Sequence, residues 1–173
     1  MGKGFPYSLG RAGVKSPVVK STTINVRDLP VTVSSMGSAV GFGTAVLAGL
    51  PEGNVLILGI VANLQFSGTG SDSNLTATWA GDFAIGTTAT ADVTLDGTDV
   101  DMIGSTALPA ATAEVGPVVR ATNAVQSIID NTDNDLEMNL NVLIDAAAIT
   151  NDTSVVLTVN GQVYISYTVL GDD

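Results

Sequence analysis

The feature that most constrains the fold is a series of short runs in which apolar and polar residues alternate. The clearest run is LEMNLNVLID (136–145). One face of this run is expected to carry Leu136, Met138, Leu140 and Val142, and the opposite, polar face Glu137, Asn139 and Asn141. A period of two is that of a strand with one buried face. Because a helical period is not sustained anywhere, we expect an all-β protein with less than about 15% helix, below the usual share.

Turn residues separate these runs and indicate how many strands there are. Pro51-Glu52-Gly53 predicts a turn between a pair of strands, because proline fixes φ and glycine tolerates positive φ. GFG (41–43) and GTGSDSN (68–74) are also interpreted as turns. Asn160-Gly161 lies between two β-rich runs and predicts a type I′ hairpin. The sequence therefore predicts about eight strands in a jelly-roll-like β-sandwich.

The composition disfavours an enzyme. The chain of 173 residues contains no histidine and no cysteine. Disulfides and cysteine-based metal sites are therefore excluded, and the commonest general base is missing. Only 13% of the residues are charged, whereas 45% are apolar. We expect a non-enzymatic protein without a cofactor.

Positive charge is confined almost entirely to the start of the chain. Positions 1–27 contain five basic residues and no acid, a sum of +5, whereas Arg120 and seventeen acids give the rest −16 (1 − 17). Glycines and prolines interrupt residues 1–17, which are expected to form an extended arm ahead of a single β-sandwich domain at 18–173. The candidate partner-binding residues, expected to reach acidic surface on another protein or a neighbouring protomer, are Lys3, Arg11, Lys15 and Lys20.

The same charge distribution argues against nucleic acid and membrane as partners. Five positive charges spread over positions 1–27 are few for a nucleic-acid arm, and the acidic remainder would repel phosphate. The most apolar stretches, residues 40–50 and 55–66, are too short to span a bilayer. We therefore expect a soluble, non-secreted protein that binds neither nucleic acid nor membrane.

Two acidic clusters suggest calcium, because oxygen ligands at alternate positions suit that ion. They are Asp96–Asp101 and Asp130–Glu137. Neither follows the EF-hand order, since the second lacks the turn glycine and the first lacks the terminal Glu, so solvated loop acids are the favoured interpretation. A carbohydrate-binding surface needs exposed aromatic rings, and the chain has few: Trp79, three Tyr and four Phe. Trp79 is expected in the core.

Four segments resemble a known family of virion proteins. GTAVLAGLPEGNVLILGIVANLQF, GDFAIGTTATAD, LEMNLNVLID and YTVLGDD are similar to the capsid decoration (cement) proteins of tailed bacteriophages, of the trimeric jelly-roll kind, over roughly residues 38–173. The resemblance implies a homotrimer, made in the host cytoplasm, that sits on the outer surface of an icosahedral capsid. There it would bind the major capsid protein and bridge neighbouring subunits.

Two alternatives stay open at this stage. One is another phage virion component, such as a head fibre, a tail part or an adsorption module. The other is a carbohydrate- or calcium-binding sandwich module.

Overall fold

The protein is almost entirely β-structure. A computed structural model describes residues 18–34, 40–68, 75–111, 115–123, 127–149 and 154–170. These residues form nine strands: β1 (Lys20–Ser34), β2 (Val40–Gly49), β3 (Gly53–Gly68), β4 (Gly81–Gly86), β5 (Ile103–Leu108), β6 (Val115–Asn123), β7 (Ser127–Asn131), β8 (Glu137–Asp145) and β9 (Ser154–Val169). The helical elements of this described part are two 3₁₀ turns, η1 (Gly97–Asp99) and η2 (Ala146–Ala148). The all-β prediction is confirmed.

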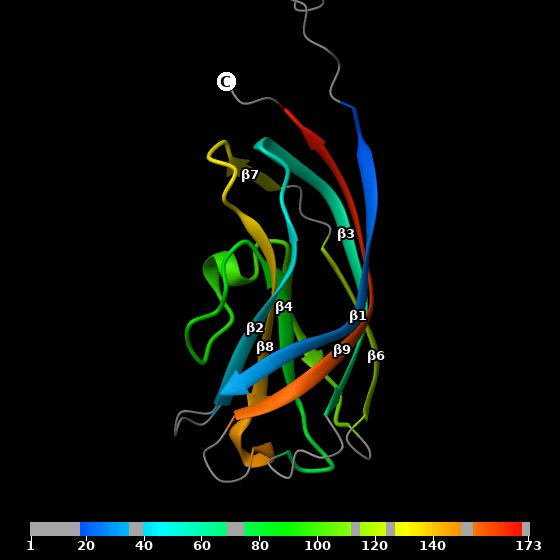
Figure 1. Cartoon of the computed structure of the whole chain (residues 1–173), viewed down its shortest axis with the longest axis vertical. Helices are drawn as coiled ribbons and strands as arrows, with labels where there is room; N and C mark the ends of the chain where they lie inside the picture. Colours follow the sequence, from blue (N-terminus) through cyan, green and yellow to red (C-terminus); the bar gives the residue numbers. More distant parts are fainter. Residues whose placement is uncertain are drawn as a thin grey trace, which may run out of the picture.

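The strands form two packed layers. All pairs are antiparallel, and the strand order is β5-β4-β8-β2-β1-β9-β3-β6. β1 and β2 pair only at Ser34 and Phe42, so the sheet folds over at this point (Figure 1). One layer is β6-β3-β9-β1 and the other is β2-β8-β4-β5. β7 continues the edge made by β6, because both pair with the same strand, β3.

The order of the strands is that of a jelly roll. Apart from β4 to β5, and the step from β6 to β7 along one edge, each connection passes from one layer to the other. The end strands β5 and β6 also contact each other, so the sandwich is nearly closed. The nine strands therefore occupy eight positions, as in a double-sheet jelly roll. The prediction of a jelly-roll-like sandwich is confirmed.

The core lies between the two layers. Phe66 on β3 and Phe83 on β4 meet there, with ring centroids 5.2 Å apart. Both side chains are buried, and Trp79 is buried too, as the sequence predicts. Aliphatic side chains from both layers complete the core, among them Val31, Val33, Leu64, Leu140, Val142 and Val159.

A bulge in β1 keeps its apolar residues in this core. Val26 is buried, and after the bulge the buried residues are Val31 and Val33, so the inward positions change from even to odd numbers. Asp28 has a φ of 47° within the bulge. Its backbone N–H donates to Asn160 Oδ1 at 2.9 Å, and Asn160 Nδ2 donates to Asp28 Oδ1 at 3.2 Å. The extra residue therefore lets both halves of one long strand face the core.

The predicted hairpin at Asn160-Gly161 is wrong. Both residues lie inside β9, which runs without interruption and pairs with β1 on one side and β3 on the other. Gly161 has a φ of 145°, and a Cβ atom there would lie 2.0 Å from the carbonyl oxygen of Asn63. Glycine is needed for this close approach of β3, and pairing on both sides overrides the local turn preference.

Two further turn predictions need correction. The turn at Pro51 to Gly53 exists, with a φ of 99° at Gly53, but the strands that it joins lie in opposite layers and do not pair with each other. The GFG segment lies within β2, where a Cβ atom on Gly43 would be 2.2 Å from the carbonyl oxygen of Thr32. Because glycine has no Cβ atom, the backbone of β2 at Gly43 can lie close to the backbone of β1 at Thr32. Most of GTGSDSN lies outside the described residues.

Two of the three residues on the polar face predicted for β8 are buried, and Glu137 is exposed. Asn139 and Asn141 belong to that predicted face, but they are only 6% and 0% exposed. The segment from Thr87 to Met102, here named the covering loop, accepts their hydrogen bonds, with Asn141 Nδ2 2.9 Å from the carbonyl oxygen of Thr88. The alternation in β8 is therefore real, but its two asparagines bind the covering loop instead of water.

Candidate binding surfaces

The outer face of the β6-β3-β9-β1 layer carries very little charge, and we call it the neutral face. Its two central strands, β3 and β9, have sixteen residues each and no charged residue. The charged residues of the whole layer, including β7, are Lys20, Arg27, Asp28, Arg120 and Asp130. In a chain with a net charge of −11, this face is distinct because it is nearly free of acids.

Uncharged polar side chains on the neutral face join β1 to β9. Gln162 on β9 donates to Asn25 on β1 at 2.9 Å, and the hydroxyl of Tyr164 donates to Gln162 Oε1. The hydroxyl oxygens of Ser21 and Ser166 are 2.9 Å apart. Because two of these three bonds join β1 to β9, this part of the face is preformed.

Exposed apolar side chains lie on the same layer. Val118 on β6 and Ile128 on β7 are 63% and 62% exposed, and Tyr164 on β9 is 41% exposed. Half-buried Leu56 and Val61 on β3 lie in register with Ile128 and Tyr164, respectively. A broad face that combines aliphatic groups, a tyrosine and amides has the composition of the centre of a protein interface.

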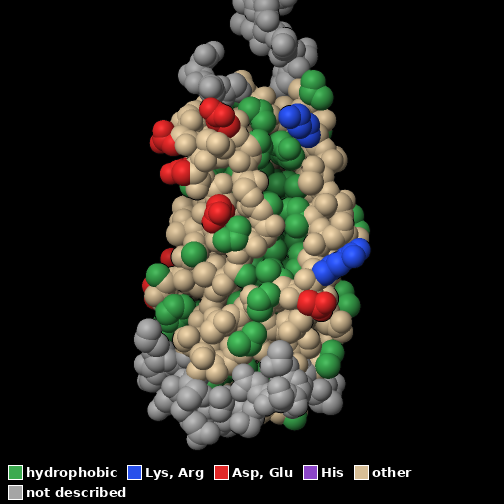
Figure 2. All heavy atoms as spheres, in the orientation of Figure 1, with side chains coloured by type: hydrophobic (Ala, Val, Ile, Leu, Met, Phe, Trp, Pro, Cys, Tyr) green, Lys and Arg blue, Asp and Glu red, His purple; other side chains and the backbone are tan. Residues whose placement is uncertain are grey.

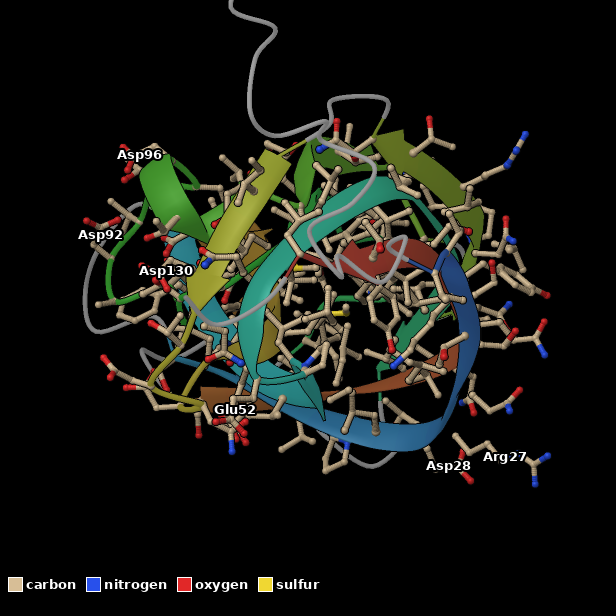
Figure 3. The ribbon with its side chains drawn as sticks, turned by 90° about the horizontal axis from the view of Figure 1, so that it is seen from above. Arg27, Asp28, Glu52, Asp92, Asp96 and Asp130 are labelled. Atoms are coloured by element: carbon tan, nitrogen blue, oxygen red, sulfur yellow. The ribbon has the colours of Figure 1, made fainter. Side chains whose placement is uncertain are left out.

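Three acids lie on the side of the molecule away from Arg27 (Figure 3). Viewed from above, Asp92, Asp96 and Asp130 project from the side opposite Arg27 (Figure 3). Asp92 and Asp96 belong to the covering loop, and Asp130 lies in β7. The covering loop is therefore an acidic part of the described surface that lies away from Arg27 (Figure 3).

Threonines hold two of these carboxylates in place. The hydroxyl and backbone N–H of Thr94 donate to Asp92 and lower its pKa. The same two groups of Thr132 donate to Asp130, whose pKa is also lowered. These carboxylates therefore stabilise their own turns.

Asp99 has the opposite shift. Partial burial raises its pKa, a hydrogen bond from Thr90 opposes the shift, and neighbouring carboxylates raise the pKa further. One of these neighbours, Asp101, accepts from the backbone N–H and hydroxyl of Thr87, at 2.9 and 2.7 Å. In the covering loop, Asp92 and Asp101 therefore accept hydrogen bonds from threonines. Asp99 is repelled by the carboxylates near it.

The alternative functions require side chains that bind calcium or carbohydrate. Within the described residues, no three acidic side chains gather closely enough to hold a metal ion. Trp79, Phe66 and Phe83 are buried in the core and do not offer a ring to a sugar, whereas Tyr164 is partly exposed. No helix in the described part of the chain is long and apolar enough to cross a membrane.

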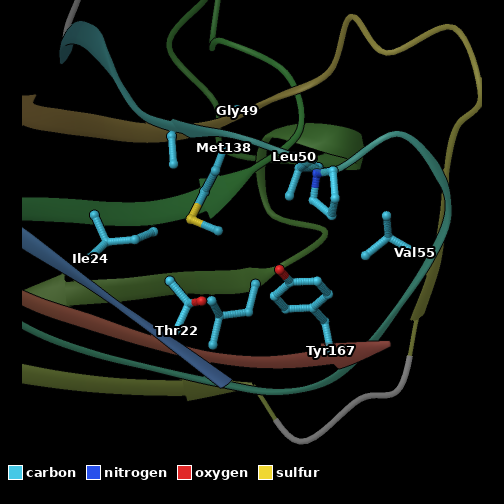
Figure 4. Close-up of a pocket in the computed structure, with 10 residues that line it drawn as sticks. Thr22, Ile24, Gly49, Leu50, Val55, Met138 and Tyr167 are labelled. Carbon is cyan, nitrogen blue, oxygen red and sulfur yellow. The ribbon is translucent and has the colours of Figure 1, made fainter. Parts of the chain in front are cut away.

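A cleft opens between β1 and β2, where the two layers separate. At one end lies a cavity of about 80 Å³ lined by Thr22, Ile24, Ala48, Gly49, Leu50, Pro51, Val55, Met138, Ile165 and Tyr167 (Figure 4). A second hollow of about 140 Å³ continues along Ile24, Asn25, Val26, Arg27, Leu29, Val46 and Leu47. Figure 2 shows a band of hydrophobic side chains down this face of the molecule. The cleft is therefore mostly apolar and open to solvent.

Only one of the predicted site residues can be placed. Lys20 is the first residue of β1, is exposed, and pairs with Tyr167 of β9. Lys3, Arg11 and Lys15 lie outside the described residues. The neutral face is not among the predicted sites, although the absence of charge from residues 53–68 and 154–169 is visible in the sequence.

Comparisons with known proteins yield weak similarities to viral chains. Neither a protein-family model nor a curated protein matches. The chain is similar to one in the cyanophage Pam1 capsid asymmetric unit, at 13% identity over 95% of this chain and 98% of that chain, with a TM-score of 0.37. A chain in the structure of infectious bursal disease virus, Gx strain, is 14% identical over 88% of this chain and 33% of that chain, with a TM-score of 0.39. A chain of Desmodium yellow mottle tymovirus is 13% identical over 99% of this chain and 97% of that chain, with a TM-score of 0.35.

The chain thus spans about a third of the infectious bursal disease virus chain that it matches. At these TM-scores the fold assignment depends on the strand pairing described above.

Proposed function

We propose that the protein is a structural virion protein that binds the outer surface of an icosahedral phage capsid. In this proposal it binds as a homotrimer, contacts the major capsid protein and bridges neighbouring capsid subunits. The observation that carries the proposal is the neutral face of the β6-β3-β9-β1 layer. The resemblance to decoration proteins and the absence of histidine and cysteine agree with a structural role.

The physical properties of the neutral face suit a protein partner. Charged residues are depleted at the centres of protein interfaces, because burying an unpaired charge is costly. Here the central strands β3 and β9 contribute only apolar and uncharged polar groups. Asp92 and Asp96 lie on the side away from Arg27 and would remain in water when the neutral face is covered (Figure 3).

Binding across subunit boundaries would stabilise the shell by linkage. A ligand that binds only the assembled state stabilises it by about 2.7 kcal/mol per site at a free concentration of 100 times Kd. A capsid offers many equivalent sites, so a modest affinity at each one is enough. The protein therefore needs a complementary face and no catalytic group.

Co-sedimentation with purified phage heads that lack the protein tests this proposal. Tyr164→Glu places a charge in the centre of the neutral face, at a side chain that is 41% exposed. Val93→Glu is the matched control, because Val93 is 39% exposed and lies in the covering loop. We expect the unchanged chain and Val93→Glu to sediment with heads, and Tyr164→Glu to remain in the supernatant.

Two outcomes would count against the proposal. If the unchanged chain does not sediment with heads, the capsid role is wrong. If Tyr164→Glu and Val93→Glu sediment equally well, the protein binds heads by another face. Circular dichroism of each variant checks that the β-fold is retained.

A further inference from the structure

Two strand edges face each other across the cleft, and the described residues provide little pairing between them. β1 pairs with β9 along its length, but its other edge pairs with β2 only at Ser34. β2 pairs with β8 from Val40 to Gly49, and its pairing with β1 is limited to Phe42. Open edges of this kind accept an added strand through backbone hydrogen bonds.

The side chains between these edges favour an apolar occupant. Ile24, Leu47 and Tyr167 are half-buried and pack against the core from the cleft side. Val46 is 47% exposed at the rim. The cavity at the end of the cleft is lined mainly by aliphatic groups (Figure 4). An extended segment with apolar residues on one side would cover these groups.

We propose that residues 1–17 of a second copy of the chain occupy this cleft. Phe5, Tyr7 and Leu9 occupy alternate positions, so in an extended segment they share one side. Seventeen residues extend to about 56 Å, whereas Thr22 to Leu29 spans about 23 Å. The segment is therefore long enough to leave its own molecule and still cover the cleft of a neighbour.

The chain's own segment could reach the same cleft only by reversing direction before β1, whereas the segment of a second copy needs no reversal. Val18 and Val19, the described residues directly before β1, show no turn.

The acidic residues at one end of the cleft suit a basic segment. Glu52 follows Pro51 at the end of the cleft, and Glu137 pairs with Gly49, which lines it. The basic residues of β1 lie on the opposite rim. In an extended segment Lys3, Arg11 and Lys15 lie on the same side as the apolar residues and flank them along the chain. We therefore expect one basic end of the incoming segment to lie beside Glu52 and Glu137. Exposed ion pairs are weak and screened by salt, so the apolar contacts provide most of the affinity.

Cysteine crosslinking tests the exchange directly, because the chain has no cysteine of its own. Phe5→Cys, Tyr7→Cys and Leu9→Cys are each co-expressed, on separate chains of different mass, with Val46→Cys. The Val93→Cys chain, with a similarly exposed valine in the covering loop, replaces Val46→Cys as the control. After mild oxidation, we expect mixed disulfide dimers with Val46→Cys at a yield several-fold above that with Val93→Cys.

Other occupants of the cleft give different results. Equal yields with Val46→Cys and Val93→Cys, or no mixed dimer at any arm position, would overturn the proposal. A chain that carries both Phe5→Cys and Val46→Cys tests the remaining case. If it forms its disulfide within one chain while the mixed pairs do not crosslink, the segment folds back on its own molecule and the exchange is wrong.

Hydrogen exchange on the full chain gives a second readout. Replacing Phe5, Tyr7 and Leu9 together by serine should speed amide exchange in β1 and β2 along the cleft. Val14→Ser, an apolar change outside the alternating positions, should not. Unchanged exchange in the triple variant would contradict the proposal. Both experiments use the isolated protein, so their outcome does not depend on binding to phage heads.

Discussion

Asn141 holds the covering loop onto β8 through three hydrogen bonds. Its Oδ1 accepts from the backbone N–H of Thr90 at 2.9 Å, and its Nδ2 donates to the carbonyl oxygens of Thr88 and Asp99 at 2.9 and 3.0 Å. An unsatisfied buried polar group costs about 1–3 kcal/mol. Asn141→Leu should therefore lower the free energy of unfolding by at least about 2 kcal/mol in urea denaturation. Asn63→Leu, on the outer face of β3, is the control; an equal loss there would contradict the argument.

Gly161 is constrained by the backbone of the neighbouring strand. Its φ is 145°, and a Cβ atom would lie 2.0 Å from the carbonyl oxygen of Asn63. Gly161→Ala should lower the free energy of unfolding by at least about 2 kcal/mol, since strained backbone and overpacking each cost about 1–3 kcal/mol. Gly104→Ala is a matched control on β5, where nothing lies within 4 Å of the added Cβ. Thermal denaturation that does not distinguish the two variants would show that β3 lies further away.

Asp99 makes stability depend on pH. Because its pKa is raised in the folded protein, its ionisation opposes folding, and the free energy of unfolding falls as pH rises from the ordinary Asp value through the raised pKa. Asp99→Asn removes this effect. The melting temperature of Asp99→Asn relative to the unchanged chain should therefore rise between about pH 3 and about pH 7, on either side of the usual Asp pKa. Calorimetry showing a constant difference over that range would contradict the assignment.

At the scale of an element, the bulge in β1 fixes which residues face the core. Deleting Asp28 would remove the extra residue and turn either Val26 or Val31 and Val33 toward solvent. We expect a loss of at least about 3 kcal/mol, the cost of emptying one or two large aliphatic sites. Asp28→Gly keeps the bulge and accepts positive φ, so it should change stability by less than about 1 kcal/mol. Similar urea midpoints for the two variants would show that β1 can shift its register freely.

The sequence predicts strands better than it predicts their partners. The alternation at 136–145 correctly identifies β8, because a period of two is a local property. The Asn160-Gly161 pair misleads, since the decisive neighbours of β9 are β1 and β3, which are distant in the chain. Asn139 and Asn141 mislead for a similar reason, because the covering loop is not apparent from the pattern in β8. The fold class could be predicted, but the neutral face required knowledge of which strands lie side by side.

At the scale of the whole molecule, we expect three copies to associate. The cleft and the exposed aliphatic side chains of β6 and β7 leave more apolar surface than one copy covers. Light scattering after size exclusion should give a mass three times the 17.5 kDa of one chain. The family resemblance supplies the number three. A mass of one chain at micromolar concentration would contradict the homotrimer.

The position of β9 has a consequence for how the protein is made. It lies between β1 and β3, and the hydroxyls of Ser21 and Ser166, which bond to each other, are 145 residues apart. A nascent chain therefore cannot complete this layer until β9 has left the ribosome. Folds dominated by such distant pairings form slowly. Chains that stop before β9 would lack the strand that joins β1 to β3, and so could not form this layer.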